Sequence, residues 1–160
     1  MFTNWIWKGE QVEYIISRTT KALMVERNGI YRTKVLDGER FIYLKESLMR
    51  VINRNCTMNG AALTGRIETV GHVLDSNSKL PMPVAPSKGF YLFPTTSIRN
   101  PNCVVLSYNQ ISLPVIPQED GILIRFNDNT VLDVKVSLRQ FQNQYQRTGD
   151  VIRFYRKLKG

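Results

Sequence analysis

The sequence is poor in the residue types from which enzymes most often build reactive sites. It contains one histidine, His72, and two cysteines, Cys56 and Cys103, among 160 residues. These three residues show none of the short spacings, such as C-x₂-C or H-x₃-H, that are typical of zinc sites. We therefore expect both cysteines to be small buried apolar side chains and His72 to make a local hydrogen bond.

The sequence also lacks the common catalytic motifs, including G-x-x-x-x-G-K-[ST], G-x-S-x-G and H-E-x-x-H. Acidic residues such as Glu119, Asp120 and Asp128 stand in turn-like contexts. A metal-dependent nuclease needs several carboxylates that converge on one cation. The sequence therefore favours a protein that is not an enzyme and that needs neither a metal nor another cofactor. A metal-dependent nuclease is kept as an alternative.

Long apolar runs are missing as well. No segment approaches the roughly 18 apolar residues needed to cross a bilayer, and residues 1–8 show neither the basic start nor the apolar stretch of a secretory signal. We expect a cytoplasmic protein with reduced thiols that is not associated with a membrane.

Acidic residues are few relative to basic ones. The chain has 22 lysines and arginines against 13 acids, a formal net charge of +9. Residues 135–160 alone contribute +6, because Asp150 is their only acid. The basic residues of this segment are Lys135, Arg139, Arg147, Arg153, Arg156, Lys157 and Lys159. Such a charge attracts polyanions, which can be nucleic acid, an anionic membrane or an acidic protein; binding to DNA would associate the protein with the nucleoid.

The length and the periodicity predict one domain over residues 1–160, with N-terminal strands in 1–45 and a basic helical segment at 137–160. Strand-like runs occupy 12–17, 22–27, 30–36 and 40–44, with turns at Asn28-Gly29 and Asp37-Gly38. Residues 47–55 fit either a helix or a strand. Asn59-Gly60 and Gly65 are expected to mark turns, and the prolines of 75–86 favour a loop.

In the second half, strands are expected at 90–93 and 103–108, and Pro114 and Pro117 should break the next stretch. Residues 122–126 and 131–136 predict a hairpin around Asn127-Asp128-Asn129. Ser137 is a candidate N-cap for a helix, which Gly149 should interrupt before Asp150 starts a second one. The predicted fold class is α+β, a β-rich single domain with antiparallel hairpins and C-terminal helices.

Residues 140–159 combine basic side chains with amides. Arginine and lysine bind phosphates, asparagine and glutamine read base edges, and arginine suits a narrow A/T-rich minor groove. The amides of this segment are Gln140, Gln142, Asn143, Gln144 and Gln146. A solvated amphipathic helix would show the same pattern, so these residues alone leave both interpretations open.

Several segments together resemble the competence transcription factor (ComK) family. Their order and spacing from Leu48 to Phe154 carry the resemblance, whereas the first 45 residues match only loosely. The segments are Asn53-Arg54-Asn55-Cys56, Gly60, Gly65-Arg66, Phe90-Tyr91-Leu92-Phe93-Pro94-Thr95, Asn102-Cys103, Asn127-Asp128-Asn129 and Phe141-Gln142-Asn143-Gln144-Tyr145-Gln146-Arg147-Thr148.

The resemblance implies a bacterial activator of DNA-uptake genes. It implies binding to A/T-rich double-stranded promoter boxes through the minor groove, as homodimers that pair into tetramers. RNA polymerase and a proteolytic adaptor are further implied partners. Better-known members continue past the position of Lys159 with a charged helical tail. We therefore expect a short family branch, and a truncated paralogue that forms mixed oligomers with a full-length activator is the alternative.

The candidate DNA-binding residues come from two sources. Arg54, Arg66 and Arg147 lie in segments that match the family. A second set rests on charge and position alone: Arg99, Arg139, Arg153, Arg156 and Lys157.

Overall fold

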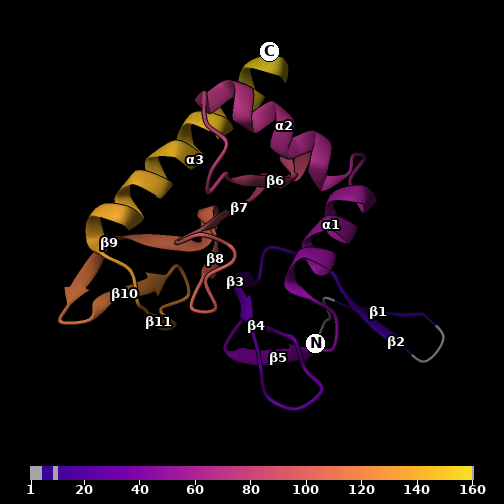
Figure 1. Ribbon diagram of the computed structural model, residues 1–160, viewed down its shortest axis with the longest axis vertical. Helices are drawn as coiled ribbons and strands as arrows, with labels where there is room; N and C mark the ends of the chain where they lie inside the picture. Colours follow the sequence, from indigo (N-terminus) through magenta and orange to yellow (C-terminus); the bar gives the residue numbers. More distant parts are fainter. Residues whose placement is uncertain (1–4, 9–10, 160) are drawn as a thin grey trace.

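An antiparallel sheet, called the large sheet here, runs through the middle of the molecule (Figure 1). The computed structural model describes residues 5–8 and 11–159; residues 1–4, 9–10 and 160 of the expected domain lie outside this description. Within the described residues the strand order is β5-β4-β3-β8-β7-β6. The strands are β3 (Thr20–Val25), β4 (Thr33–Asp37), β5 (Arg40–Leu44), β6 (Met82–Ala85), β7 (Phe90–Pro94) and β8 (Val104–Ser107).

The β4–β5 hairpin confirms the turn predicted from Asp37-Gly38. Its register pairs Asp37 with Arg40, so Gly38 and Glu39 form a two-residue loop. Gly38 has a φ of 60°, a conformation that glycine adopts without strain. A separate hairpin, β1 (Trp5–Lys8) with β2 (Gln11–Tyr14), leads into the large sheet.

The loop predicted for residues 75–86 is partly wrong, because Met82–Ala85 forms strand β6. This strand lies at the edge of the large sheet, paired only with β7. An edge strand tolerates Pro83, because one side of the strand has no neighbouring strand to which a backbone N–H would have to donate. A short 3₁₀ turn, η1 (Pro86–Lys88), joins β6 to β7.

Two helices cover one face of the large sheet (Figure 1). Residues 47–55, for which a helix and a strand were both possible, belong to helix α1 (Leu48–Met58) and its cap. Ser47 caps this helix by accepting the Arg50 N–H on its hydroxyl at 3.3 Å. Helix α2 (Leu63–Leu74) contains Gly65, so the turn predicted there is wrong. Glycine costs a helix about 1 kcal/mol relative to alanine, and the buried side chains of Leu63 and Val70 offset that cost.

A smaller sheet covers part of the other face. It consists of β9 (Ile111–Gln118), β10 (Gly121–Phe126) and β11 (Val131–Val134), and it follows η2 (Tyr108–Gln110). The predicted 122–136 hairpin is confirmed as β10–β11. The break expected at Pro114 and Pro117 is wrong, because both prolines lie in β9. This strand is an edge strand whose register shifts opposite Leu123 and Arg125, which makes room for residues without an N–H.

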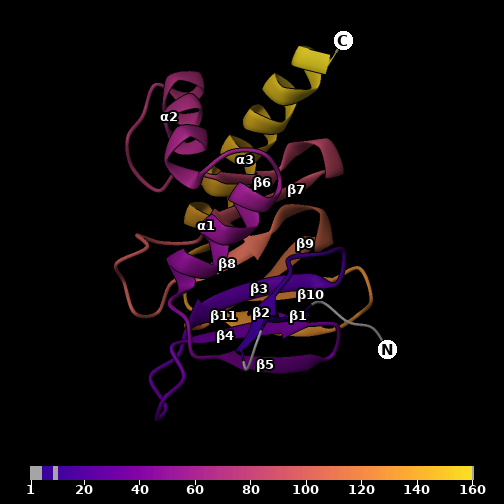
Figure 2. The same cartoon turned by 90° about the vertical axis from the view of Figure 1, so that its right-hand side faces the viewer.

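Helix α3 (Leu138–Lys159) is continuous over 22 residues, about 33 Å. The predicted interruption at Gly149 and restart at Asp150 are therefore wrong. Gly149 is buried, and a Cβ built on it would lie 3.3 Å from the Tyr108 hydroxyl. The glycine thus allows α3 to approach η2 closely. Figure 2 shows α3 running from the level of the sheets to the far end of the molecule.

A buried lysine connects the two sheets. Lys21 of β3 is 2% exposed, and its ammonium group donates to the Gly38 carbonyl and pairs with Asp128 in the β10–β11 turn, both at 2.6 Å. Burial alone would raise the pKa of the Asp128 carboxyl. Hydrogen bonds from Lys21 and Thr130, together with the Lys21 charge, outweigh burial and hold this pKa at about 2.

The depressed pKa of Asp128 predicts an acid-sensitive contribution to stability. This contribution is complete above the ordinary value of 3.8 and disappears as the pH falls through about 2. We expect Asp128→Asn to be less stable than the wild type at neutral pH. The difference should shrink between pH 4 and pH 2 in urea unfolding followed by circular dichroism. A constant difference over that range would contradict this assignment.

Among the described helices, no segment is both long and apolar enough to cross a membrane.

Candidate nucleic-acid interface

The start of α3 is fixed by a cap and by aromatic packing. Ser137 accepts the Gln140 N–H on its hydroxyl at 3.1 Å, which confirms its predicted role. Fully buried Phe93 of β7 lies against two rings of the helix, with centroid distances of 6.1 Å to Phe141 and 6.3 Å to Tyr145. Tyr145 also stacks on Tyr108 at 4.3 Å. The first half of α3 is therefore held firmly on the sheets.

Packing on one side leaves the opposite side of α3 to solvent. Positions that recur every three or four residues form one face, called the outer face of α3. All are exposed except Asp150, which is half-buried. The face consists of Arg139, Gln142, Asn143, Gln146, Asp150, Arg153 and Lys157. It carries three cations and one acid, and Arg153 forms an ion pair with that acid.

The helix dipole explains only part of this charge. Cations in the last turn are stabilised by the negative C-terminal end of a helix, which accounts for Arg156, Lys157 and Lys159. Arg139 lies in the first turn, where a cation is unfavourable and where α3 has no acid. The helix dipole therefore does not explain Arg139.

Buried Gln144 joins α3 to the α2–β6 loop and to the end of strand β7. Its amide donates to the carbonyls of Lys79 at 2.7 Å and Pro94 at 2.8 Å. Arg147 adds bonds to the Lys79 carbonyl at 3.2 Å, the Ser78 carbonyl at 3.0 Å and the Ser76 hydroxyl at 3.2 Å. Arg147 thus positions the α2–β6 loop, and the buried amide of Gln144 is not available for reading bases.

Arg54 and Arg66, which the family segments single out, also have intramolecular partners. Arg54 donates to both carboxylate oxygens of Glu46, at 2.5 and 2.6 Å. Arg66 is 8% exposed and donates to the carbonyls of Asn59, Ala61 and Cys56 at 2.8, 3.3 and 3.5 Å, which closes the end of α1. Their predicted contact with DNA stays a prediction, and their bonding favours a structural role.

Asn55 supports the fold in the same segment as Arg54. Its side chain is 1% exposed, accepts the Ile16 N–H at 2.8 Å and donates to the carbonyls of Tyr14 at 3.0 Å and Val51 at 2.9 Å. It therefore binds the chain after β2 to α1. Burial raises the pKa of the neighbouring Cys56 thiol to about 11, against the opposing effect of Arg66, so Cys56 is the buried neutral side chain that was expected.

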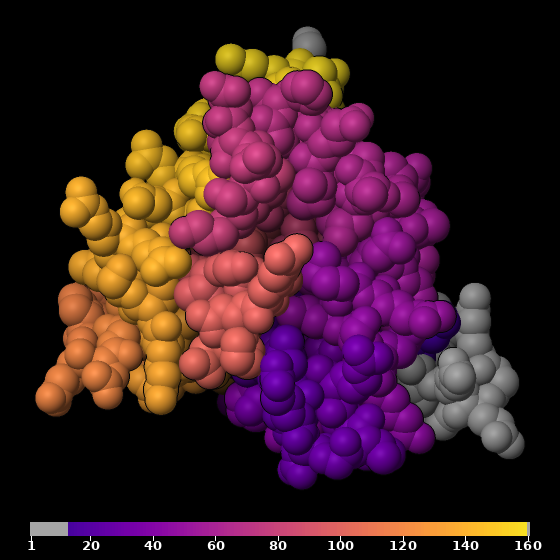
Figure 3. All heavy atoms as spheres, in the orientation of Figure 1, coloured from indigo at the N-terminus to yellow at the C-terminus, as the bar shows by residue number. Residues whose placement is uncertain are grey.

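Arg99 lies in the loop between β7 and β8, which is braced at both ends. Thr95 donates its hydroxyl to the Val104 carbonyl at 2.8 Å, and the Cys103 N–H donates to the Asn100 carbonyl at 2.9 Å. Among the described residues, none forms a hydrogen bond or ion pair with the exposed guanidinium of Arg99. Figure 3 shows this loop (salmon) on the same face of the molecule as the first half of α3 (orange).

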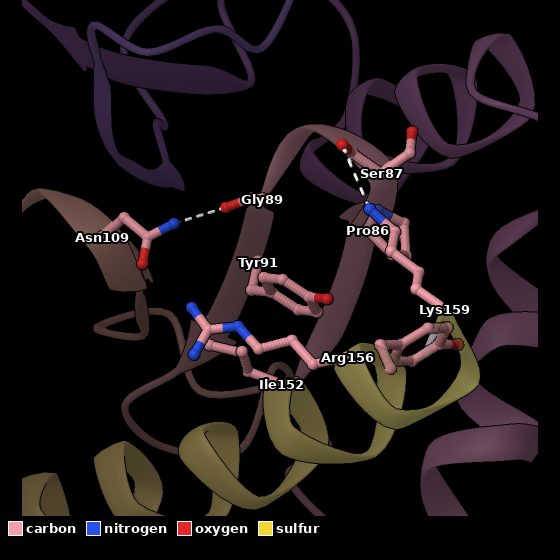
Figure 4. Close-up of a pocket in the computed structure, with 9 residues that line it drawn as sticks. Pro86, Ser87, Gly89, Tyr91, Asn109, Ile152, Arg156 and Lys159 are labelled. Atoms are coloured by element: carbon pink, nitrogen blue, oxygen red, sulfur yellow. Dashed lines mark hydrogen bonds between the residues drawn. The ribbon is translucent and has the colours of Figure 1, made fainter.

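Arg156 points away from the outer face of α3. It lines a cavity of about 180 Å³ together with Tyr91, Ile152 and Lys159 (Figure 4). Lys159 reaches the Ser87 carbonyl at 3.5 Å, which connects the end of α3 to η1. The structure therefore groups Arg139, Arg153 and Lys157 on one face of α3, leaves Arg99 exposed in the β7–β8 loop and directs Arg156 toward η1.

In the part of the chain that the structure describes, no group of three or more histidine, cysteine or acidic side chains could hold a metal ion.

Comparisons with known proteins agree with the sequence resemblance. A curated relative, the competence transcription factor of Bacillus subtilis (strain 168), is 25% identical over 136 residues, which are 84% of this chain and 71% of that protein. No solved structure matches the chain. The family model described as ComK protein matches residues 11–158. Because this match spans nearly the whole sequence, the chain belongs to the ComK family.

Proposed function

We propose that this protein is a DNA-binding transcription regulator of competence genes, and that the outer face of α3 is its main contact with DNA. The observation that carries the proposal is the exposed row of cations and amides on that face. Arg139, Arg153 and Lys157 would bind phosphates, and the amides between them would contact sugars or base edges. The name of the relative from Bacillus subtilis supports the same assignment.

The dimensions of DNA indicate that α3 and the β7–β8 loop make different contacts with the duplex. An α-helix with side chains is about 10–12 Å wide, whereas the minor groove is about 6 Å wide. Helix α3 can therefore lie along the phosphates or in the major groove, but it cannot enter the minor groove. If A/T-rich boxes are read in the minor groove, a narrow element must reach them. Arg99 on its braced loop fits that requirement.

This division predicts that Arg99→Ala removes sequence preference more than affinity. We expect the wild type to prefer a duplex with paired A/T-rich boxes over a G/C-shuffled duplex by about tenfold or more, about 1.4 kcal/mol. The variant should bind both duplexes about equally, because the phosphate contacts of α3 persist. Fluorescence anisotropy at near-physiological salt measures both affinities.

Arg27→Ala is the matched control for Arg99→Ala, because Arg27 is also an exposed arginine in a loop between strands. It should keep the preference for the A/T duplex. If Arg99→Ala keeps the full preference as well, Arg99 does not read the groove. If even the wild type shows no preference, the proposed A/T specificity is wrong.

A further inference from the structure

Strand β5 is an edge strand that exposes aromatic side chains. It pairs with β4 on one side and with no described strand on the other. Phe41 is 43% exposed and Tyr43 is 41% exposed. Figure 2 shows β5 at the lower end of the molecule, away from α2 and the end of α3. An open strand edge with large apolar side chains invites pairing with another strand.

The other edges of the large and small sheets carry features that oppose such pairing. Strand β6 contains Pro83 and packs against α1 and α2. Strand β9 contains Pro114 and Pro117, and β11 places Asp133 in its exposed half. The centre of β5, Phe41-Ile42-Tyr43, contains neither proline nor charge. Of these described edge strands, β5 alone has a centre without proline or charge, so another strand could pair with it there.

Two residues of β5 direct their backbone N–H and carbonyl groups toward the open edge, where a second strand would pair. The Leu44 carbonyl accepts the Arg32 N–H at 2.8 Å, so Leu44 turns its backbone groups toward the β4 side. Residues of an antiparallel strand alternate between facing one neighbour and facing the other. Phe41 and Tyr43 therefore direct their N–H and carbonyl groups away from β4, toward the open edge.

We propose that β5 pairs antiparallel with β5 of a second copy of this chain, in a register centred on Ile42. In this register Phe41 lies opposite Tyr43 of the second copy, and Glu39 lies opposite its Lys45. Each pairing occurs twice because the contact is two-fold symmetric. Aromatic pairs and opposite charges directly across two strands are both stabilising.

Neighbouring registers lose this complementarity. A register centred on Phe41 would leave Glu39 opposite Tyr43, and one centred on Tyr43 would place Phe41 opposite Lys45. All four side chains involved are exposed. Phe41 and Tyr43 lie on one face of β5, since they are two residues apart, and Glu39 and Lys45 directly flank the two ends of this strand. The match of charge with charge and ring with ring thus favours the register centred on Ile42.

The inferred contact specifies the homodimer that was expected for a member of this family, and it rests on that expectation. In this register, side chains that point to one face of β5 lie opposite side chains that point to the same face in the second copy. Equivalent faces of the two large sheets therefore lie on the same side of the joined sheet. Because α3 packs on one face of the large sheet, the two α3 helices would lie on the same side of the dimer. One DNA duplex could then contact both outer faces.

The test compares Tyr43→Glu with Val131→Glu by sedimentation equilibrium of the full chain without DNA. Tyr43 lies opposite Lys34 in the β4–β5 hairpin, so a glutamate there has a cation beside it in the folded monomer. Val131 is the matched control, because it is 53% exposed on edge strand β11 and lies opposite Arg125. Circular dichroism verifies that both variants are folded.

We expect a wild-type dimer whose dissociation constant rises about tenfold or more in Tyr43→Glu and is unchanged in Val131→Glu. Glu39→Lys should also weaken the dimer, and the swap Glu39→Lys with Lys45→Glu should restore it. A monomeric wild type, an unaffected Tyr43→Glu dimer or dissociation by Val131→Glu would each overturn the proposal. Since no DNA is present, none of these outcomes bears on DNA binding by α3.

Discussion

Asn55→Leu should destabilise the protein by roughly 2 kcal/mol or more, because it removes the buried hydrogen bonds that join Asn55 to the Ile16 N–H and the Tyr14 carbonyl. Leucine has a similar volume but cannot accept the Ile16 N–H or donate to the Tyr14 carbonyl. Each buried polar group that loses its hydrogen bond costs about 1–3 kcal/mol. Urea unfolding followed by circular dichroism gives the change in the free energy of unfolding.

Asn53→Ala is the matched control for Asn55→Leu. Asn53 is exposed on α1, and its side-chain oxygen accepts the Leu63 N–H at 2.9 Å, which caps α2 from outside that helix. Losing such a cap costs about 1 kcal/mol. If the two variants lose equal stability, Asn55 does not anchor the chain after β2 in the way described here.

The triple variant Arg139→Gln, Arg153→Gln, Lys157→Gln should weaken DNA binding by about 100-fold at physiological salt. Each phosphate contact releases condensed counterions, and three lost contacts together account for this factor. The fold should be little affected, because all three side chains are exposed. Fluorescence anisotropy with an A/T-rich duplex measures the change in the dissociation constant.

A second triple variant separates local contacts from net charge. Arg18→Gln, Arg27→Gln, Arg32→Gln removes the same charge from exposed positions that flank β3 and lie outside α3. It should weaken binding only slightly. Equal losses in the two triple variants would show that net charge, and not the outer face of α3, determines affinity.

Local signals in the sequence predicted local structure well. The glycine of Asp37-Gly38 and the polar Asn127-Asp128-Asn129 turn both mark hairpins that the structure confirms. Ser137 was identified correctly as a cap because capping depends only on the next few residues. The α+β fold class with antiparallel hairpins followed from these signals.

Features that depend on distant parts of the chain were missed. Pro83 and Pro114 are compatible with strands because β6 and β9 lie at sheet edges, and the sequence does not reveal which strands are edges. Gly149 does not end α3, because the helix approaches Tyr108 closely at that position. Both errors came from applying a local rule where tertiary packing decides.

The same limit applies to the candidate DNA-binding residues. Arg54, Arg66 and Arg147 were chosen because they lie in family segments, yet each donates to acceptors within the fold. The buried Asn55 could have been found from periodicity, since Leu48, Val51, Ile52 and Cys56 place it on the apolar side of α1. The outer face of α3 became visible only when one continuous helix replaced the two that were predicted.

The most direct test of the central claim is the salt dependence of DNA binding by the wild type and by the α3 triple variant. Anisotropy titrations at several salt concentrations give the slope of log affinity against log salt for each protein. If Arg139, Arg153 and Lys157 each neutralise one phosphate, the magnitude of the slope should fall by about 2.7 in the variant. Identical slopes and affinities in the two proteins would show that the outer face of α3 is not the DNA-binding surface.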